Sequence, residues 1–255
     1  MARARIAKIL LFTSILLSSA SSAEQAQLIV DFDNSAKTSR SPYAVLFQEQ
    51  HSLDPVVQLI NETVPLREQV RVIIGAEDGP LFDPNINEIW VPDAFLDEID
   101  TRFSDADLVN NATDKETVVL DVLVHTLLHE MGHAVIAQFN IPTLGKEEDA
   151  ADNLANVLLL EYLDEGDSIV INAADMFALE DQDKDTFEDA DFWDEHSLDL
   201  QRYFTSLCHV YGSHPDDHDD LIRTGELSAD RAERCIDEYE IIAADWLHVL
   251  SELER

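Results

Sequence analysis

The stretch TVVLDVLVHTLLHEMGHAVIAQF, residues 117–139, decides how this chain is interpreted. Its apolar spacing predicts one long helix, which Asn140 and Pro142 would end. Inside it, His129 and His133 are four residues apart, so they share one helix face about 6 Å apart along the axis. Both rings could bind one zinc ion. Glu130, beside the first histidine, is placed to take a proton from a metal-bound water.

A third ligand is expected from the next predicted helix, residues 147–163. A catalytic zinc needs three protein ligands and one open position. Glu148 and Asp152 are four residues apart and share a face, so Glu148 could bind the metal while Asp152 accepts the other ring N–H of a ligating histidine. The alternative is an ordinary acidic first turn that the helix dipole favours, which fits Glu147 and Asp149.

His125 lies on the same stripe as the two motif histidines. It is eight residues from His133, about 12 Å along the helix, so the two rings cannot share one metal with His129. Pairing His125 with His129 would leave no glutamate next to the first ligand. We therefore predict that His125 is a core or supporting residue.

At these residues the sequence resembles the gluzincins, zinc peptidases with an HExxH helix and a glutamate ligand on a following helix. The resemblance implies a zincin-like fold, one zinc ion per chain bound by His129, His133 and Glu148, and hydrolysis of peptide bonds with Glu130 as general base. It also implies a group that stabilises the oxyanion, for which His196 is the first choice; Tyr211 and Arg202 follow. The equal alternative for His196 is a structural role at the start of the helix expected at 197–211.

The chain also resembles a family of secreted bacterial metallopeptidase-like proteins of unknown function, over roughly residues 50–250. The resemblance implies peptidase activity on a peptide or protein, but gives no substrate. By analogy with zincins, the strand expected at 88–91 would be the edge strand along which a peptide binds. The residues that carry the resemblance are Phe82-Asp83-Pro84, Glu88-Ile89, the motif helix, 147–152, His196-Ser197-Leu198, Gln201-Arg202 and the two cysteines.

The rest of the sequence predicts an α+β fold in which a small N-terminal sheet packs on a mostly helical C-terminal part. β-Branched runs at 71–74 and 88–91, with a weaker one at 27–32, favour strands. Apolar residues at helical spacing predict strong helices at 197–211 and 229–253. Weaker helices are expected at 53–60, 93–103 and 169–179, with acidic stretches at 180–195 and 214–220.

The N-terminus has the pattern of a signal peptide. Three basic residues within the first eight precede an apolar run at 9–17, and small residues at 21–23 fit a cleavage site. This run is shorter than the ~20 residues that span a bilayer. We therefore expect residues 1–23 to be removed and 24–255 to form a single zincin-like domain, exported to the periplasm or cell exterior without a membrane anchor.

Cysteine content and charge agree with export. Cys208 and Cys235 are the only cysteines, and an even count in an exported chain favours a disulfide between them over two separate buried thiols. The 16 basic and 53 acidic residues give a formal charge of −37. Since nucleic-acid binding needs a basic surface, that function is excluded, and an anionic membrane surface is disfavoured.

Two other functions fit the same sequence. A zinc-bound but non-catalytic secreted protein could use the scaffold for binding a partner, although it would not need an intact Glu130. An acidic secreted binding protein in which HExxH occurs by coincidence would bind no stoichiometric zinc. The zinc-dependent peptidase accounts for more of the residues than either alternative.

Overall fold

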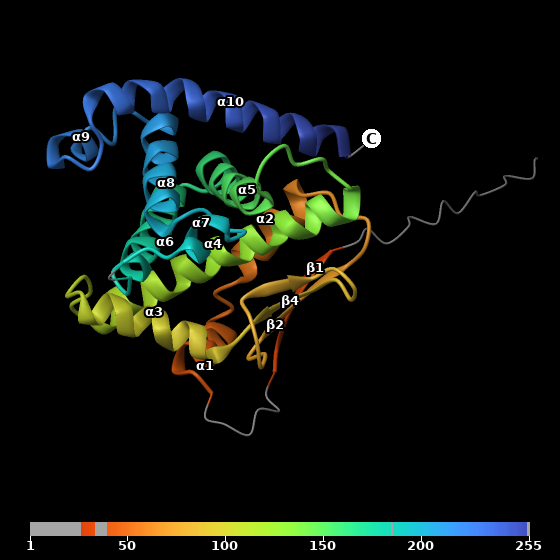
Figure 1. The fold of residues 1–255 in the computed structure, drawn as a ribbon. Helices are drawn as coiled ribbons and strands as arrows, with labels where there is room; N and C mark the ends of the chain where they lie inside the picture. The colour runs from red at the N-terminus through yellow and green to blue at the C-terminus, as the bar shows by residue number, and fades with distance from the viewer. Residues whose placement is uncertain (1–26, 34–39, 185, 254–255) are drawn as a thin grey trace, which may run out of the picture.

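The computed structural model describes residues 27–33, 40–184 and 186–253, and within them a small sheet precedes a set of packed helices (Figure 1). The strands are β1 (Leu28–Phe32), β2 (Val70–Ile74), β3 (Leu81–Asp83) and β4 (Glu88–Val91). Their order across the sheet is β1-β2-β4-β3. The first two pairings are parallel, and β3 runs antiparallel to β4. The predicted α+β class is confirmed.

The helices occupy most of the described chain. They are α1 (Pro42–Gln50), α2 (Asp54–Thr63), α3 (Asp93–Asp105), α4 (Ala112–Phe139), α5 (Glu147–Tyr162), α6 (Gly166–Asp181), α7 (Asp189–Trp193), α8 (Asp199–Ser213), α9 (Asp220–Thr224) and α10 (Ala229–Leu253).

Alternating side chains fix how the sheet packs. Val70, Val72 and Ile74 of β2 are fully buried, whereas Arg71 between them is exposed. This period of two puts one face of the sheet into the core, where α4 contacts β3 and β4. Figure 1 shows α4 crossing over the sheet, with α5 on its other side.

Helix α4 is the central element of the fold. The Asn111 side chain accepts hydrogen bonds from the amides of Thr113 and Asp114 at its start, and Asn140 ends it in the left-handed conformation. Fifteen of its residues are buried. By length and composition alone α4 could cross a membrane, but 83% of its most apolar window is buried inside the protein, as is typical of a core helix.

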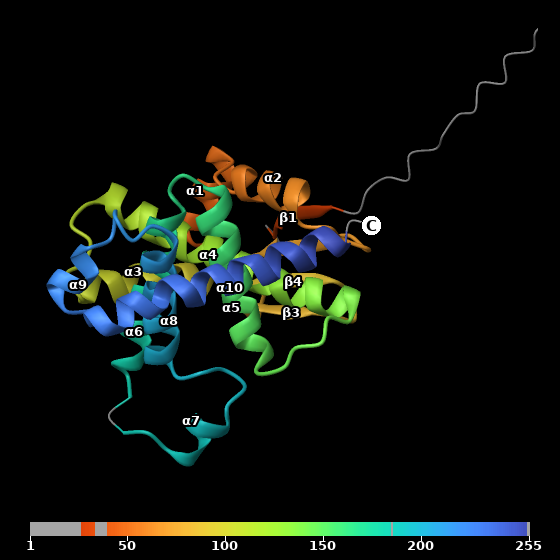
Figure 2. The same cartoon turned by 90° about the horizontal axis from the view of Figure 1, so that it is seen from above.

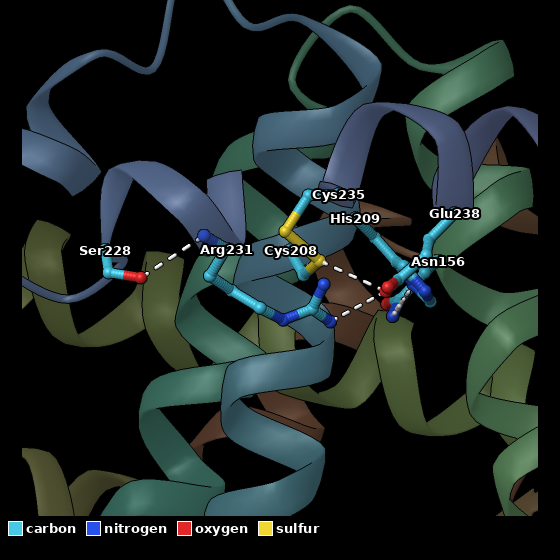
Figure 3. Close-up of a disulfide and its surroundings, with 7 residues drawn as sticks. All are labelled: Asn156, Cys208, His209, Ser228, Arg231, Cys235 and Glu238. Carbon is cyan, nitrogen blue, oxygen red and sulfur yellow. Dashed lines mark hydrogen bonds and ion pairs between the residues drawn. A yellow bond between two sulfur atoms is a disulfide. The ribbon is translucent and has the colours of Figure 1, made fainter. Parts of the chain in front are cut away.

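Helix α10 lies across α5 and α8 (Figure 2). Gly212 allows close packing, because a Cβ there would lie 2.3 Å from the carbonyl oxygen of Cys235. Beside this contact Cys208 and Cys235 form the predicted disulfide, with a Cα–Cα distance of 5.1 Å. Figure 3 shows the bond with the Arg231–Glu238 ion pair of α10 next to it.

The predicted strands and the seven predicted helices are present, within a few residues of the expected ends. The sequence prediction missed α1, α7, α9 and the three-residue strand β3. One expectation is wrong: residues 88–91 are not the edge strand, because β4 lies between β2 and β3. The predicted signal peptide lies outside the described residues.

Loss of the disulfide should lower the stability of the domain. The bond closes a loop with a sequence separation of 27, for which the loss of unfolded-chain entropy corresponds to about 3–4 kcal/mol. We expect Cys208→Ser/Cys235→Ser to lower the free energy of unfolding by about that amount in a guanidinium titration. A reducing agent should have the same effect on the wild type and none on the double variant. Equal stability of the two proteins would contradict this account.

Candidate active site

Helices α4 and α5 pack antiparallel, and their polar residues meet in register. Each step of four residues forward along α4 is matched by a step of four back along α5, so the pairs lie on one line between the helices. The pairs are His125 Nε2 with Asn156 Oδ1 at 3.1 Å, His129 Nδ1 with Asp152 Oδ1 at 2.7 Å, and His133 Nε2 with Glu148 Oε2 at 3.2 Å.

A glycine inside the histidine motif allows this approach. A Cβ built on Gly132 would lie 2.9 Å from the Cα of Ala151 and 3.1 Å from its Cβ, closer than side chains ordinarily pack. Because neither α4 nor α5 is interrupted here, any larger residue would push the two helices apart. Gly132 and Ala151 together therefore set the distance between the histidines of α4 and the carboxylates of α5.

Three ligand atoms converge where the two helices meet. His129 Nε2 lies 3.2 Å from His133 Nε2 and 3.1 Å from Glu148 Oε2, and His133 Nε2 lies 3.2 Å from the same oxygen. Two ligands held at about 2.0–2.1 Å from a tetrahedral metal ion are roughly 3.3–3.4 Å apart. The triangle of His129, His133 and Glu148 therefore fits one such ion.

The outer nitrogen of each ring has a carboxylate partner. His129 Nδ1 faces Asp152, and His133 Nδ1 lies 3.0 Å from Glu147 Oε1. A proton held on Nδ1 by a carboxylate leaves the Nε2 lone pair directed at the centre of the triangle. The contact of Glu147 was missed in the sequence, where this residue fitted a plain helix first turn.

The ionisable groups at the centre of the cluster strongly shift one another's pKa values. Burial alone would raise the pKa of Glu148, but hydrogen bonds from His129, His133 and His196 hold it well below its usual range. Burial alone would lower the pKa of His129, and the bonds from Asp152 and Glu148 raise it instead to about 9. Imidazole nitrogens that face one another and a carboxylate need protons or a metal ion between them, and two nitrogens with one oxygen suit a divalent transition metal.

His196 reaches the same carboxylate from outside the helix pair. It lies just before α8, its side chain is 41% exposed, and its Nε2 is 2.9 Å from Glu148 Oε2. The Lys146 ammonium donates to the His196 carbonyl at 2.6 Å, which fixes this segment against the start of α5. His129, Glu148 and His196 form a second group, whose ligand atoms lie within 4.8 Å of one another.

Glu130 follows the first histidine on α4 and is 93% buried, with 7% relative exposure. Its carboxylate makes no hydrogen bond or ion pair within the described chain. Burial raises the pKa of Glu130 above its ordinary value. A buried, unpaired carboxylate next to a metal site has the properties of a group that accepts and releases protons.

A family model described as "Putative metallopeptidase" matches residues 32–250, most of the chain. The chain belongs to this metallopeptidase family. Neither the comparison with curated proteins nor the comparison with solved structures gave a match. The family supports a hydrolase that uses a metal, and the described chain contains a possible His/Glu/His metal site at His129, Glu148 and His196.

In this metallopeptidase a buried arginine supports the ligand helix. Arg202 of α8 donates two hydrogen bonds to Asp152, at 2.8 and 2.9 Å, and its guanidinium lies 3.8 Å above the Phe177 ring. Burial would raise the pKa of Asp152, but Arg202 and His129 hold it well below its usual range. Arg202 is thus committed to Asp152. Tyr211, nine residues further along α8, is about 13 Å away from Arg202 along the axis.

The cluster opens into a cleft of about 360 Å³. His129, Glu130 and His133 line one side of it, and Pro80, Leu81 and Phe82 line another. The edge strand β3 therefore borders the cleft, the position that the sequence had assigned to residues 88–91.

Changing Gly132 should weaken metal binding without touching a ligand. We expect Gly132→Ala to cost about 1–3 kcal/mol of stability through overpacking against Ala151. It should also lower metal affinity roughly tenfold, because α5 carries Glu148. Competition with a chromophoric chelator measures the affinity. Gly145→Ala is the matched control, since a Cβ there meets nothing within 4 Å. Equal affinity in the two variants would show that this contact does not set the ligand geometry.

Proposed function

We propose that this metallopeptidase is an exported zinc-dependent peptidase of the gluzincin type, which cleaves peptide bonds in peptides or proteins. The observation that carries the proposal is the triangle of His129, His133 and Glu148, with mutual distances of 3.1–3.2 Å on two antiparallel helices. Glu130 lies beside it with its carboxylate unpaired in the described chain. His129, His133 and Glu148 would hold one zinc ion per chain.

When bound, zinc supplies Lewis-acid polarisation of the scissile carbonyl and lowers the pKa of a water molecule. Glu130 takes the proton that this water loses as its oxygen attacks the carbonyl carbon. It then delivers the proton to the leaving amine as the C–N bond breaks. The raised pKa of Glu130, caused by burial, suits a group that serves as base and then as acid.

His196 is assigned to the oxyanion and not to the metal. A catalytic zinc keeps one position open for substrate and water, so a fourth protein ligand would close the site. His196 is the most exposed of the three histidines around Glu148, and its raised pKa, due first to Glu148, favours an N–H that donates. From there it would donate a hydrogen bond to the oxyanion as the carbonyl becomes tetrahedral.

The substrate lies in the cleft along β3. As an edge strand of the described sheet, β3 has an outer side that faces away from β4, where an extended peptide would pair with it. This arrangement brings a peptide past Glu130 and the ligand triangle, since both line the same cleft. An extended peptide or an unfolded protein segment is therefore the expected substrate.

Export is supported by two features. The N-terminal residues have the basic, apolar and small-residue order of a signal peptide. The disulfide between Cys208 and Cys235 is of the kind that persists in oxidising compartments. We propose a periplasmic or extracellular location in a bacterium.

Two variants separate metal binding from catalysis. We expect Glu130→Gln to keep one zinc per chain and to lower hydrolysis of unfolded proteins by roughly 10²–10⁴, because the general base is lost. Glu148→Ala should instead lose zinc, as measured by metal analysis after gel filtration. Asp149→Asn, from the same helix turn, is the control for both. Zinc binding with no cleavage by the wild type would support the non-catalytic zinc protein instead.

His196 gives a second, independent test. We expect His196→Phe to lower kcat roughly 10²–10³-fold, because an oxyanion donor is lost, and to leave zinc affinity nearly unchanged. His214→Phe, at an exposed position away from the cluster, should change neither quantity. A large loss of zinc affinity in His196→Phe would make His196 a ligand and overturn its assigned role.

A further inference from the structure

A second cavity, of about 140 Å³, begins at the same catalytic residues and lies between α4 and α6. His129, Glu130 and His196 line it, so it is continuous with the site of chemistry. Most of the remaining wall is apolar. These wall residues are Pro80, Phe95, Val122, Ala173, Met176 and Phe177. A cavity of roughly 150 Å³ holds a benzene molecule, so this one has room for a single side chain.

Nearly all polar side chains in the wall have partners. His125 bonds to Asn156, and Thr126 donates to the carbonyl of Val122. His129 and Arg202 both bond to Asp152, and His196 bonds to Glu148. Two do not: Glu130 and Glu180 make no side-chain hydrogen bond or ion pair within the described chain. The mechanism accounts for Glu130. Glu180 has no hydrogen-bonded or ion-paired partner in the described chain, and the mechanism gives it no role.

Helix α6 turns Glu180 toward the cavity. Ala173, Met176, Phe177 and Glu180 recur at helical spacing, and all four line the wall. The side chain is partly buried, and burial raises the pKa of Glu180, with Asp199 adding to the effect and Arg202 and Arg102 opposing it. A carboxylate in such surroundings is stabilised when a cation pairs with it.

In the described chain, Arg202 and Arg102 attract the charge of Glu180, but both are already paired with other carboxylates. The Arg202 guanidinium, which also lines the cavity, is bound to Asp152. Arg102 is bound to Glu98 and Asp183 at 2.8 Å each. His125 is held neutral, because burial lowers its pKa to about 4. The carboxylates of Glu98 and Asp199 add negative charge near Glu180.

We propose that this cavity is a specificity pocket for a lysine or arginine side chain of the substrate, with the Glu180 carboxylate binding its cationic end. The inference rests on the proposed peptidase function and adds the substrate class. The aliphatic stem of a basic side chain would lie against Met176 and Phe177, and its charge would meet Glu180. A net charge of −37 also favours the approach of basic peptides.

Matched peptides test the pocket. Peptides blocked at both ends would carry lysine, norleucine or glutamate at the residue on either side of the scissile bond. Norleucine has the same stem as lysine without the charge. We expect the wild type to prefer lysine over norleucine about 10- to 100-fold in kcat/KM, and Glu180→Gln to lose this preference while cleaving the norleucine peptide normally. Glu98→Gln removes a nearby charge that does not line the cavity, and should keep the preference.

A binding experiment needs no turnover. Titration of n-butylammonium, a lysine side-chain analogue, should shift amide resonances of α6 in the wild type and in Glu98→Gln, but not in Glu180→Gln. The uncharged analogue n-butanol should not distinguish the three proteins. Such binding without cleavage of any peptide would keep the pocket and reject the peptidase. Cleavage with equal rates for lysine and norleucine would reject the pocket and keep the peptidase.

Discussion

The close antiparallel packing of α4 on α5 is the constraint on which the rest of the structure depends. Gly132 admits Ala151 at a distance that no larger residue at this position would allow. With the helices this close, residues four apart on one meet residues four apart on the other, and one register places His125, His129 and His133 opposite their partners. A slip by one residue would turn the carboxylates of α5 away from every histidine. The metal site is thus a consequence of helix packing.

Burying so many ionisable groups costs free energy unless each is paired. In this protein, hydrogen bonds and ion pairs extend outward from the site and offset that cost. Asp152 accepts from His129 on one side and from Arg202 on the other, and Arg202 rests on Phe177. Behind this layer, Asn156 joins His125 to His209 through bonds of 3.1 Å. Each helix that contributes to the site is therefore tied to the next by a satisfied polar contact, which holds the ligand atoms in place.

Local patterns predicted the helix that carries the histidines, its partner and the ligand spacing, because these depend on periodicities of three and four residues. The contact of Glu147 with His133 was not predicted, since an acidic first turn has a sufficient local reason. Strand β3 is three residues long, too short for any alternation to show. The edge strand was wrongly predicted because the edge is decided by which strands pair across the sheet, and the residues of β4 look the same in an inner or an outer strand.

The two carboxylates that remain unpaired in the described part of the cavity differ in a way that separates their roles. Glu130 follows a metal ligand directly in sequence, so its position is tied to the ligand triangle and to the water that would be activated there. Glu180 is on α6, which contributes no ligand, and it faces the same space from another wall. The other polar groups around this cavity have partners within the protein. We therefore infer that the two unpaired carboxylates bind groups that come from outside it. Glu130 then takes part in the reaction, and Glu180 selects the substrate. Each role can be tested by changing one residue without changing the other.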